Sequence, residues 1–129
     1  MKKLLLLLIM QATITVFGQA HLGCTYSELK EFEPDATFQT GSTDDGIAYV
    51  CFASVRGVFA YYFNEDIVVH CRLIPYNVGC VNMQCEIYNK KYTIVTSSQW
   101  TAYLGNGGKN KIVLSSNDDG LWVFDYYPL

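Results

Sequence analysis

Apolar and polar residues alternate with two different periods along the chain, and the first period is helical. An apolar stripe recurs every third residue and consists of Tyr26, Leu29 and Phe32. Thr25 precedes the stripe and Glu28 follows Thr25 by three positions, which is the spacing of a capping box. Because Pro34 cannot continue a helix, we predict a short helix that begins after Thr25 and ends before Pro34.

After Pro34 the apolar period changes to two. Apolar residues occupy the odd positions of three segments, as in strands with one buried face, and these segments are 47–53, 57–63 and 67–73. The connections 54–56 and 64–66 have an ordinary hairpin length. We therefore predict an antiparallel meander, preceded by a short strand near residues 37–40. In this register Phe59 is a core residue flanked by Cys51 and Cys71.

The second half repeats this change of period. Residues 78–90 carry an apolar stripe at helical spacing and predict a second helix. Further strands are predicted at 92–96, 100–104, 112–115 and 121–127. The turn Asn117–Gly120 joins the last two strands into a hairpin.

These elements define the expected fold class. The order is helix, strands, helix, strands, and we expect an α+β domain with one antiparallel sheet and the two helices packed on one face. Both halves contain an Asp-Asp-Gly turn before an apolar strand, at residues 44–46 and 118–120. This similarity raises the alternative of a twofold repeat.

The N-terminus has the three parts of a secretory signal peptide. Lys2 and Lys3 precede an apolar run from Leu4 to Met10, and the small residue Ala20 marks the expected cleavage site. Removing residues 1–20 from the 129 of the chain leaves one domain of 109 residues, 21–129. We expect a secreted or periplasmic protein without a membrane span in its mature form. The alternatives are a retained N-terminal anchor and a lipid anchor at Cys24.

Charge excludes one class of partner. The chain has 12 acidic and 9 basic residues, and loss of Lys2 and Lys3 leaves 7 basic residues and a net charge of −5. An acidic domain without a basic stripe repels phosphate backbones, so we do not expect a nucleic-acid partner.

All cysteines follow the predicted signal peptide, and they are Cys24, Cys51, Cys71, Cys80 and Cys85. An oxidising compartment favours disulfides among them. Cys51 and Cys71 would lie two strands apart, about 10 Å, which is too far for a disulfide. Cys80 and Cys85 would point to different sides of a helix. Bonds between sheet and helix, or to Cys24, remain, and the alternative is that several are buried thiols.

No residue pattern indicates catalysis, a metal or a cofactor. His21 and Cys24 lack a usual zinc spacing, and His21 would lie at a frayed N-terminus. His70 and Cys71 are neighbours in a strand and point to opposite faces, so they cannot form a dyad. Neither a nucleophile elbow nor a phosphate-binding loop is present.

Aromatic residues are abundant, with 10 tyrosines, 7 phenylalanines and 2 tryptophans. Exposed aromatic side chains favour contacts with proteins or carbohydrates, and the alternative is that they cover the second face of the sheet. The candidate interaction surface comprises Tyr62, Trp100, Trp122 and Tyr127. The first functional hypothesis is an exported non-catalytic module that binds a protein or carbohydrate ligand. The second is a small exported hydrolase or an enzyme-inhibitor-like protein.

Four segments carry a resemblance, and they are Tyr26–Lys30, Tyr61–Asn64, Cys71–Tyr76 and Tyr92–Tyr103. In these segments the chain resembles a class of small exported bacterial proteins of unknown function. The resemblance implies neither a substrate nor a catalytic residue.

Overall fold

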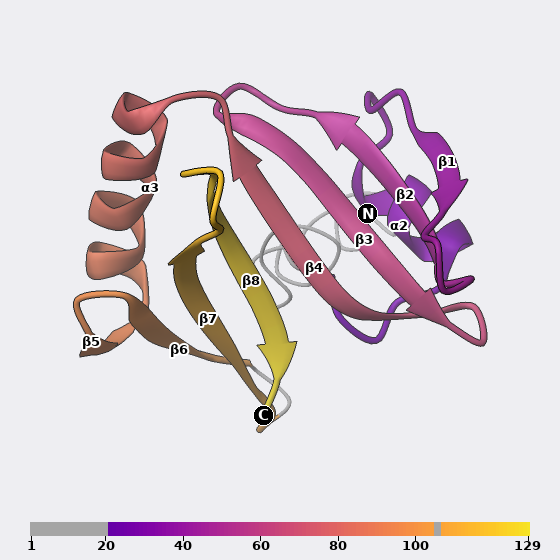
Figure 1. The fold of residues 1–129 in the computed structure, drawn as a ribbon. Helices are drawn as coiled ribbons and strands as arrows, with labels where there is room; N and C mark the ends of the chain where they lie inside the picture. Colours follow the sequence, from indigo (N-terminus) through magenta and orange to yellow (C-terminus); the bar gives the residue numbers. More distant parts are fainter. Residues whose placement is uncertain (1–20, 105–106) are drawn as a thin grey trace.

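A computed structural model describes residues 21–104 and 107–129; the predicted signal peptide lies outside the described residues. Within the described residues the fold is built on one eight-stranded antiparallel sheet (Figure 1). The strands are β1 (Gln39–Ser42), β2 (Ala48–Ala53), β3 (Gly57–Asn64), β4 (Ile67–Pro75), β5 (Thr93–Thr96), β6 (Gln99–Tyr103), β7 (Lys109–Ser116) and β8 (Trp122–Pro128). Their order in the sheet is β1-β2-β3-β4-β8-β7-β6-β5.

The α+β class expected from the sequence is wrong, because the fold is mainly β. Helix α2 (Tyr26–Phe32) has only 7 residues, whereas α3 (Val78–Lys91) has 14. The capping box of Thr25 and Glu28 is present, but Glu33 already ends the helix. So short a helix adds little to the fold, since the first turn of a helix is costly to form. The main order is therefore strands, helix, strands.

Strands β4 and β8 join two meanders at the centre of the sheet. One meander runs from β1 to β4 and the other from β5 to β8, and Arg72 pairs with Asp125 where they meet. The two Asp-Asp-Gly turns do not correspond in this arrangement, because the first joins β1 to β2 and the second joins β7 to β8. Gly46 and Gly120 both have positive φ, 86° and 79°. Their likeness therefore reflects one kind of turn and not a repeat.

The predicted register of the first meander is wrong by one residue at each hairpin. Phe59 is 4% exposed, so its place in the core is confirmed, but its neighbours are Phe52 and Leu73. Residues 54–56 connect β2 to β3 as predicted, but Ala53 pairs with Val58 and not with Gly57. Only residues 65–66 separate β3 from β4. A shift of one residue moves a side chain to the other face, so Cys51 leaves the core.

The two faces of the sheet differ in what covers them. Tyr88 of α3 packs against Trp100, Phe124 and Tyr126. Tyr26 of α2 contacts Phe63, and Leu29 is fully buried. These contacts place both helices on one side, here called the helix-bearing face. The opposite side, here called the open face, has no described helix over it and is turned to the viewer in Figure 1.

Candidate functional site

A continuous row of side chains crosses the open face from strand to strand. It is called the open-face row and comprises Tyr49, Tyr62, His70, Tyr127 and Lys111. Tyr49 pairs with Tyr62, Tyr62 with His70, and Tyr127 with Lys111. The row therefore draws one residue from each of β2, β3, β4, β8 and β7.

The aromatic members of this row are stacked. The ring centroids of Tyr62 and His70 lie 5.0 Å apart at an interplanar angle of 19°, and those of His70 and Tyr127 lie 4.7 Å apart at 10°. Tyr49 lies 6.0 Å from Tyr62 with a tilt of 44°. At the other end, Lys111 Nζ lies 5.8 Å from the centre of the Tyr127 ring. The imidazole is thus held between two phenol rings, and a cation lies over the outer ring.

A buried carboxylate fixes the middle of the row. Asp125 Oδ1 lies 2.7 Å from His70 Nε2 and accepts a hydrogen bond of 2.8 Å from Arg72 Nε. The side chain of Asp125 is 7% exposed. Burial raises the pKa of Asp125, but the hydrogen bonds from His70 and Arg72 outweigh burial and hold the pKa below its ordinary value. Asp125 therefore stays charged and orients both partners.

Charge is distributed unevenly between the strands and the rest of the molecule. The strand sequences contain a single acidic residue, Asp125, although the chain has 12. The strands also contain Arg72, Lys109 and Lys111, and all three lie on the open face. Three positive charges and one negative charge leave +2 among the strand residues of this face, in a chain whose charge from residue 21 onward is −5.

The thiols do not offer a nucleophile for His70. Burial raises the pKa of the Cys71 thiol well above its ordinary value, and burial together with nearby Glu28 raises the pKa of Cys24 to about 11. Cys71 also lies on the helix-bearing face, away from His70. In the described part of the chain, no serine, threonine or cysteine hydrogen-bonds to His70. The His70–Asp125 pair therefore lacks the third member of a nucleophilic site.

The expected disulfides are absent from the described residues. All five cysteines have free thiols; Cys24 and Cys71 are buried, and Cys51, Cys80 and Cys85 are half-buried. Cys51 points to the open face and Cys71 to the opposite one, because β2 pairs with β3 one residue out of the predicted register. This arrangement corresponds to the alternative in which the cysteines remain free thiols within the fold.

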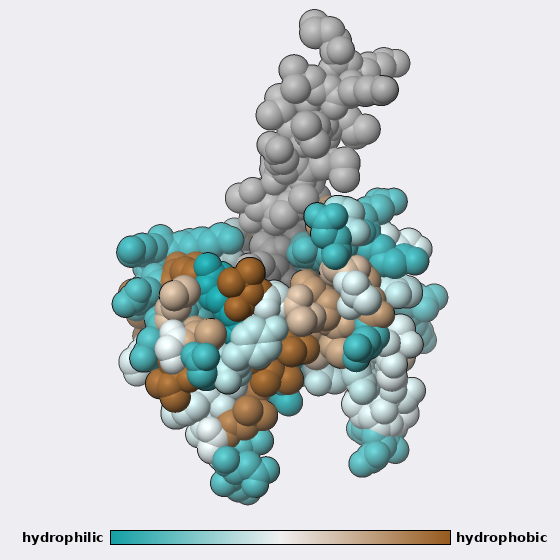
Figure 2. All heavy atoms as spheres, turned by 90° about the horizontal axis from the view of Figure 1, so that it is seen from above, coloured by the Kyte–Doolittle hydropathy of each residue, from teal (hydrophilic) through white to brown (hydrophobic). Residues whose placement is uncertain are grey.

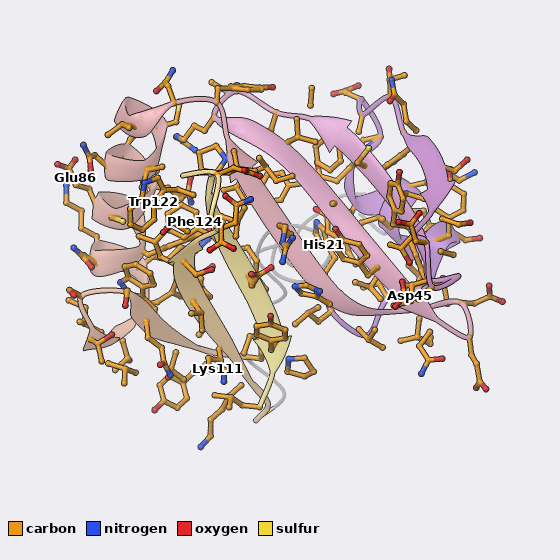
Figure 3. All side chains as sticks on the ribbon, viewed as in Figure 1. His21, Asp45, Glu86, Lys111, Trp122 and Phe124 are labelled. Carbon is orange, nitrogen blue, oxygen red and sulfur yellow. The ribbon has the colours of Figure 1, made fainter. Side chains whose placement is uncertain are left out.

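The four residues of the predicted interaction surface do not share one surface. Tyr62 and Tyr127 lie on the open face, where Tyr127 is 37% exposed. Trp100 is only 1% exposed and donates from Nε1 to Asn89 Oδ1 at 2.8 Å, so its assignment to the surface is wrong. Trp122 is 42% exposed at the start of β8, near α3 (Figure 3). The alternation of β8 places Trp122 on the parity of Phe124, on the helix-bearing side.

Trp122 lies at one end of the sheet, together with other exposed apolar residues. This sheet-end patch comprises Val55, Tyr76, Val78, Met83, Leu121 and Trp122. Figure 2 views this end of the molecule and shows hydrophobic atoms near the middle with hydrophilic atoms at the margins. The patch is separate from the open-face row, which makes its residues useful controls for the row.

His21 is in the core and not at a frayed end. Its side chain is fully buried, and its ring stacks on Phe32 with centroids 5.1 Å apart. His21 Nε2 lies 3.1 Å from Glu33 Oε1. Among residues 21–104 and 107–129, no group of three or more histidine, cysteine or acidic side chains could hold a metal ion. No helix in the same ranges has the length and apolar character needed to cross a membrane.

The sequence contains two features that point to this site and that the sequence analysis did not use. Asp125 stands between Phe124 and Tyr126 in a predicted strand, and an acidic residue inside an apolar strand needs a partner. His70 and Arg72 alternate around Cys71, so both share one face. The cross-strand neighbours Tyr49 and Lys111 could be found only from the register.

The chain has no match among the protein-family models, the curated proteins or the solved structures with which it was compared. Any inference about function therefore starts from the residues of the fold itself. The residues of the open face supply stacked aromatic rings, hydrogen-bond donors and positive charge, which are features of a binding surface.

Proposed function

We propose that this chain is an exported, non-catalytic binding module, secreted or periplasmic, whose ligand lies on the open face. The observation that carries the proposal is the Tyr62–His70–Tyr127 stack, which stands at the centre of a sheet face that no described helix covers. An antiparallel sheet needs only one buried face for its stability. Ordered aromatic and charged residues on the other face are therefore available for a ligand.

Rigidity supports this role. The stack and the Asp125 hydrogen bonds hold His70 and Arg72 before any ligand arrives. Side chains that are already ordered lose little conformational entropy on binding, which favours affinity. Tyrosine also combines a large contact area with a hydrogen-bonding hydroxyl, as binding surfaces commonly require.

The enzyme hypothesis has less support. His70 and Asp125 are placed like the base and the orienting carboxylate of a hydrolase. However, both faces of the imidazole are covered by Tyr62 and Tyr127, and the buried thiols keep their protons. An enzyme would convert a bound ligand, and His70→Ala would abolish the conversion while leaving binding measurable.

A binding panel tests the proposal. Purified protein is applied to immobilised glycans and peptides, and every hit is measured again with Tyr62→Ala, Tyr127→Ala and the control Val55→Ala. Val55 is 92% exposed and belongs to the sheet-end patch. We expect at least one ligand that both tyrosine variants lose and the control retains. The proposal would be contradicted if both tyrosine variants still bound every ligand that the wild type binds.

The export part of the proposal has its own test. N-terminal sequencing of the exported protein should find His21 first, because the small residue Ala20 precedes it at the expected cleavage site. The Cys24 side chain is 3% exposed, which disfavours a lipid there. A lipid-bearing Cys24 or an intact Met1 at the N-terminus would contradict cleavage after Ala20.

A further inference from the structure

We propose that the ligand of the open face is an acidic polysaccharide, a linear chain of carboxylate-bearing sugars that lies across the strands along the open-face row. This inference rests on the proposed binding function and adds the chemical class of the ligand. Three features of the face support it: its charge, its hydrogen-bonding groups and the spacing of the row.

Charge complementarity favours an anion. The strand residues of the open face carry Arg72, Lys109 and Lys111 against the single carboxylate of Asp125, which is already bound by Arg72 and His70. The other acidic residues of the chain lie outside the strands. A ligand with carboxylates is therefore attracted to the lysines of this face and repelled by the acidic turns that join the strands.

The groups that this face offers are mainly donors. Lysine has no acceptor, and the tyrosine hydroxyls are donors as long as they keep their protons. Burial raises the pKa values of Tyr62 and Tyr127, so both phenols remain protonated at neutral and mildly alkaline pH. Lys111 and Lys109 are each held over a ring, those of Tyr127 and Tyr103. Carboxylates and sugar hydroxyls supply acceptors for these donors.

Ring orientation separates this surface from one that stacks on neutral sugars. Because Tyr62, His70 and Tyr127 stack on one another, both flat faces of His70 and the inner face of each tyrosine are already covered. The outer face of Tyr127 carries Lys111. The ligand therefore meets ring edges and hydroxyl groups, and binding depends on hydrogen bonds and charge more than on ring stacking.

The spacing of the row suits a polymer. Neighbouring members come from adjacent strands, so they repeat at about 4.8 Å. One pyranose unit of a linear polysaccharide is similar in length to this step. An extended peptide advances by about 3.4 Å per residue and presents alternate side chains to opposite sides, so its carboxylates do not match the step. At the β1 end of the row, the missing side chain of Gly41 leaves room for the Tyr49 ring, which lies over it.

The inference is tested with three probes and isothermal titration calorimetry. The probes are tetragalacturonate, the same tetramer with its carboxylates fully methyl-esterified, and tetraglutamate. We expect tetragalacturonate to bind, with an affinity that falls as salt is raised and is roughly tenfold higher than that of either other probe. Lys111→Gln should weaken binding by roughly threefold to tenfold, and Lys111→Arg should restore it.

Matched variants test the donors without disturbing the stack. Tyr62→Phe and Tyr127→Phe retain the rings and remove only the hydroxyls, and Tyr76→Phe serves as the control in the sheet-end patch. We expect the first two to weaken tetragalacturonate binding and the control to leave it unchanged. Circular dichroism and thermal melting confirm that each variant is folded.

The results that would contradict this inference differ from those that would contradict the proposed binding function. Equal binding of the esterified tetramer, still lost in Tyr127→Ala, would overturn the acidic ligand and leave the binding module standing. Tighter binding of tetraglutamate would overturn the polysaccharide in favour of an acidic peptide. No binding of tetragalacturonate would overturn the inference, and if the broader panel also gave no ligand that depends on the row, the proposed function would fall with it.

Discussion

His70 and Asp125 meet across the central strand pair of the sheet, with Nε2 of the imidazole 2.7 Å from Oδ1 of the carboxylate. Because a carboxylate only accepts, this contact places the hydrogen of the imidazole on Nε2. The pair lies where the two meanders join, and Arg72 donates to the same carboxylate. One buried charge therefore both ties the halves together and orients the open-face row.

Asp125→Asn should lower the free energy of unfolding by about 1–3 kcal/mol, because it weakens three hydrogen bonds to a charged group, one from His70 and two from Arg72. The pKa of Asp125 is lowered in the fold, so its stabilising contribution is present above the unfolded value of about 3.9 and is lost as pH falls through the folded value. Urea unfolding from pH 7 to pH 2 measures this loss.

Comparison of Asp125→Asn with the control Asp118→Asn tests whether Asp125 causes this acid dependence. Asp125→Asn should flatten part of the acid dependence that the wild type shows below pH 4 or so. Asp118→Asn alters an exposed carboxylate of the β7–β8 turn and should leave the unfolding curve within about 0.5 kcal/mol of wild type. An Asp125→Asn protein with unchanged stability and unchanged acid dependence would refute the central role of this carboxylate.

Phe59→Ala should cost about 3–5 kcal/mol of stability, as removal of a large core side chain does. Phe59 is 4% exposed and stacks against Phe52, with centroids 5.6 Å apart. Chemical denaturation monitored by circular dichroism measures the change, and the 92% exposed Val55 provides the control Val55→Ala. A cost below about 1 kcal/mol would mean that β2 and β3 pair in another register.

Two glycines on the sheet should respond differently to alanine. At Gly57 a Cβ would collide with the carbonyl oxygen of Ile74, which is backbone and cannot turn away, so we expect Gly57→Ala to destabilise by about 1–3 kcal/mol. At Gly41 a Cβ would lie 2.6 Å from the Tyr49 hydroxyl, which is the end of a flexible side chain. Gly41→Ala should therefore leave stability nearly unchanged and displace Tyr49. Thermal melts measure the change in stability of both variants. A larger loss in Gly41→Ala than in Gly57→Ala would contradict these contacts.

The free thiols should react in two groups. At pH 8, iodoacetamide should modify the half-buried Cys51, Cys80 and Cys85 before Cys24 and Cys71. The pKa of Cys24 is raised to about 11 and that of Cys71 well above its ordinary value, so little thiolate is present at either. Peptide mass spectrometry of native and urea-unfolded protein measures the order. Rapid labelling of Cys71 in the native protein would show that the central strands open readily.

Local signals in the sequence predicted local structure well. The capping box of Thr25 and Glu28 and the turn at Asn117–Gly120 depend on residues within a few positions of one another, and both are present. The strands of the first meander lie close to the predicted segments, because alternation is also a local property. The second helix begins at Val78, as its apolar stripe predicts.

Long-range relationships could not be read in the same way. Whether Ala53 pairs with Gly57 or with Val58 shows little in the sequence, yet it exchanges the faces of β2. At the two-residue turn Glu65–Asp66, a bulge between Tyr62 and Phe63 compensates for the shorter turn, so Cys71 and Leu73 keep their predicted face. Both turn residues have positive φ, 51° and 69°, which neither glutamate nor aspartate signals as asparagine or glycine would. Trp100 looked like a surface residue because its partner Asn89 lies on another element. For the same reason the open-face row was visible only once the register was known.

Nuclear magnetic resonance mapping of a bound ligand is the most direct measurement of the central claim, that the open face is the binding surface. A ligand taken from the binding panel is titrated into wild-type protein, which avoids any effect of substitution on folding. We predict that the Hε1 signal of His70 and the ring signals of Tyr62 and Tyr127 shift with saturation, while the indole signal of Trp122 in the sheet-end patch stays in place. Saturable shifts at Trp122 with unchanged signals from His70 and the two tyrosines would contradict the account.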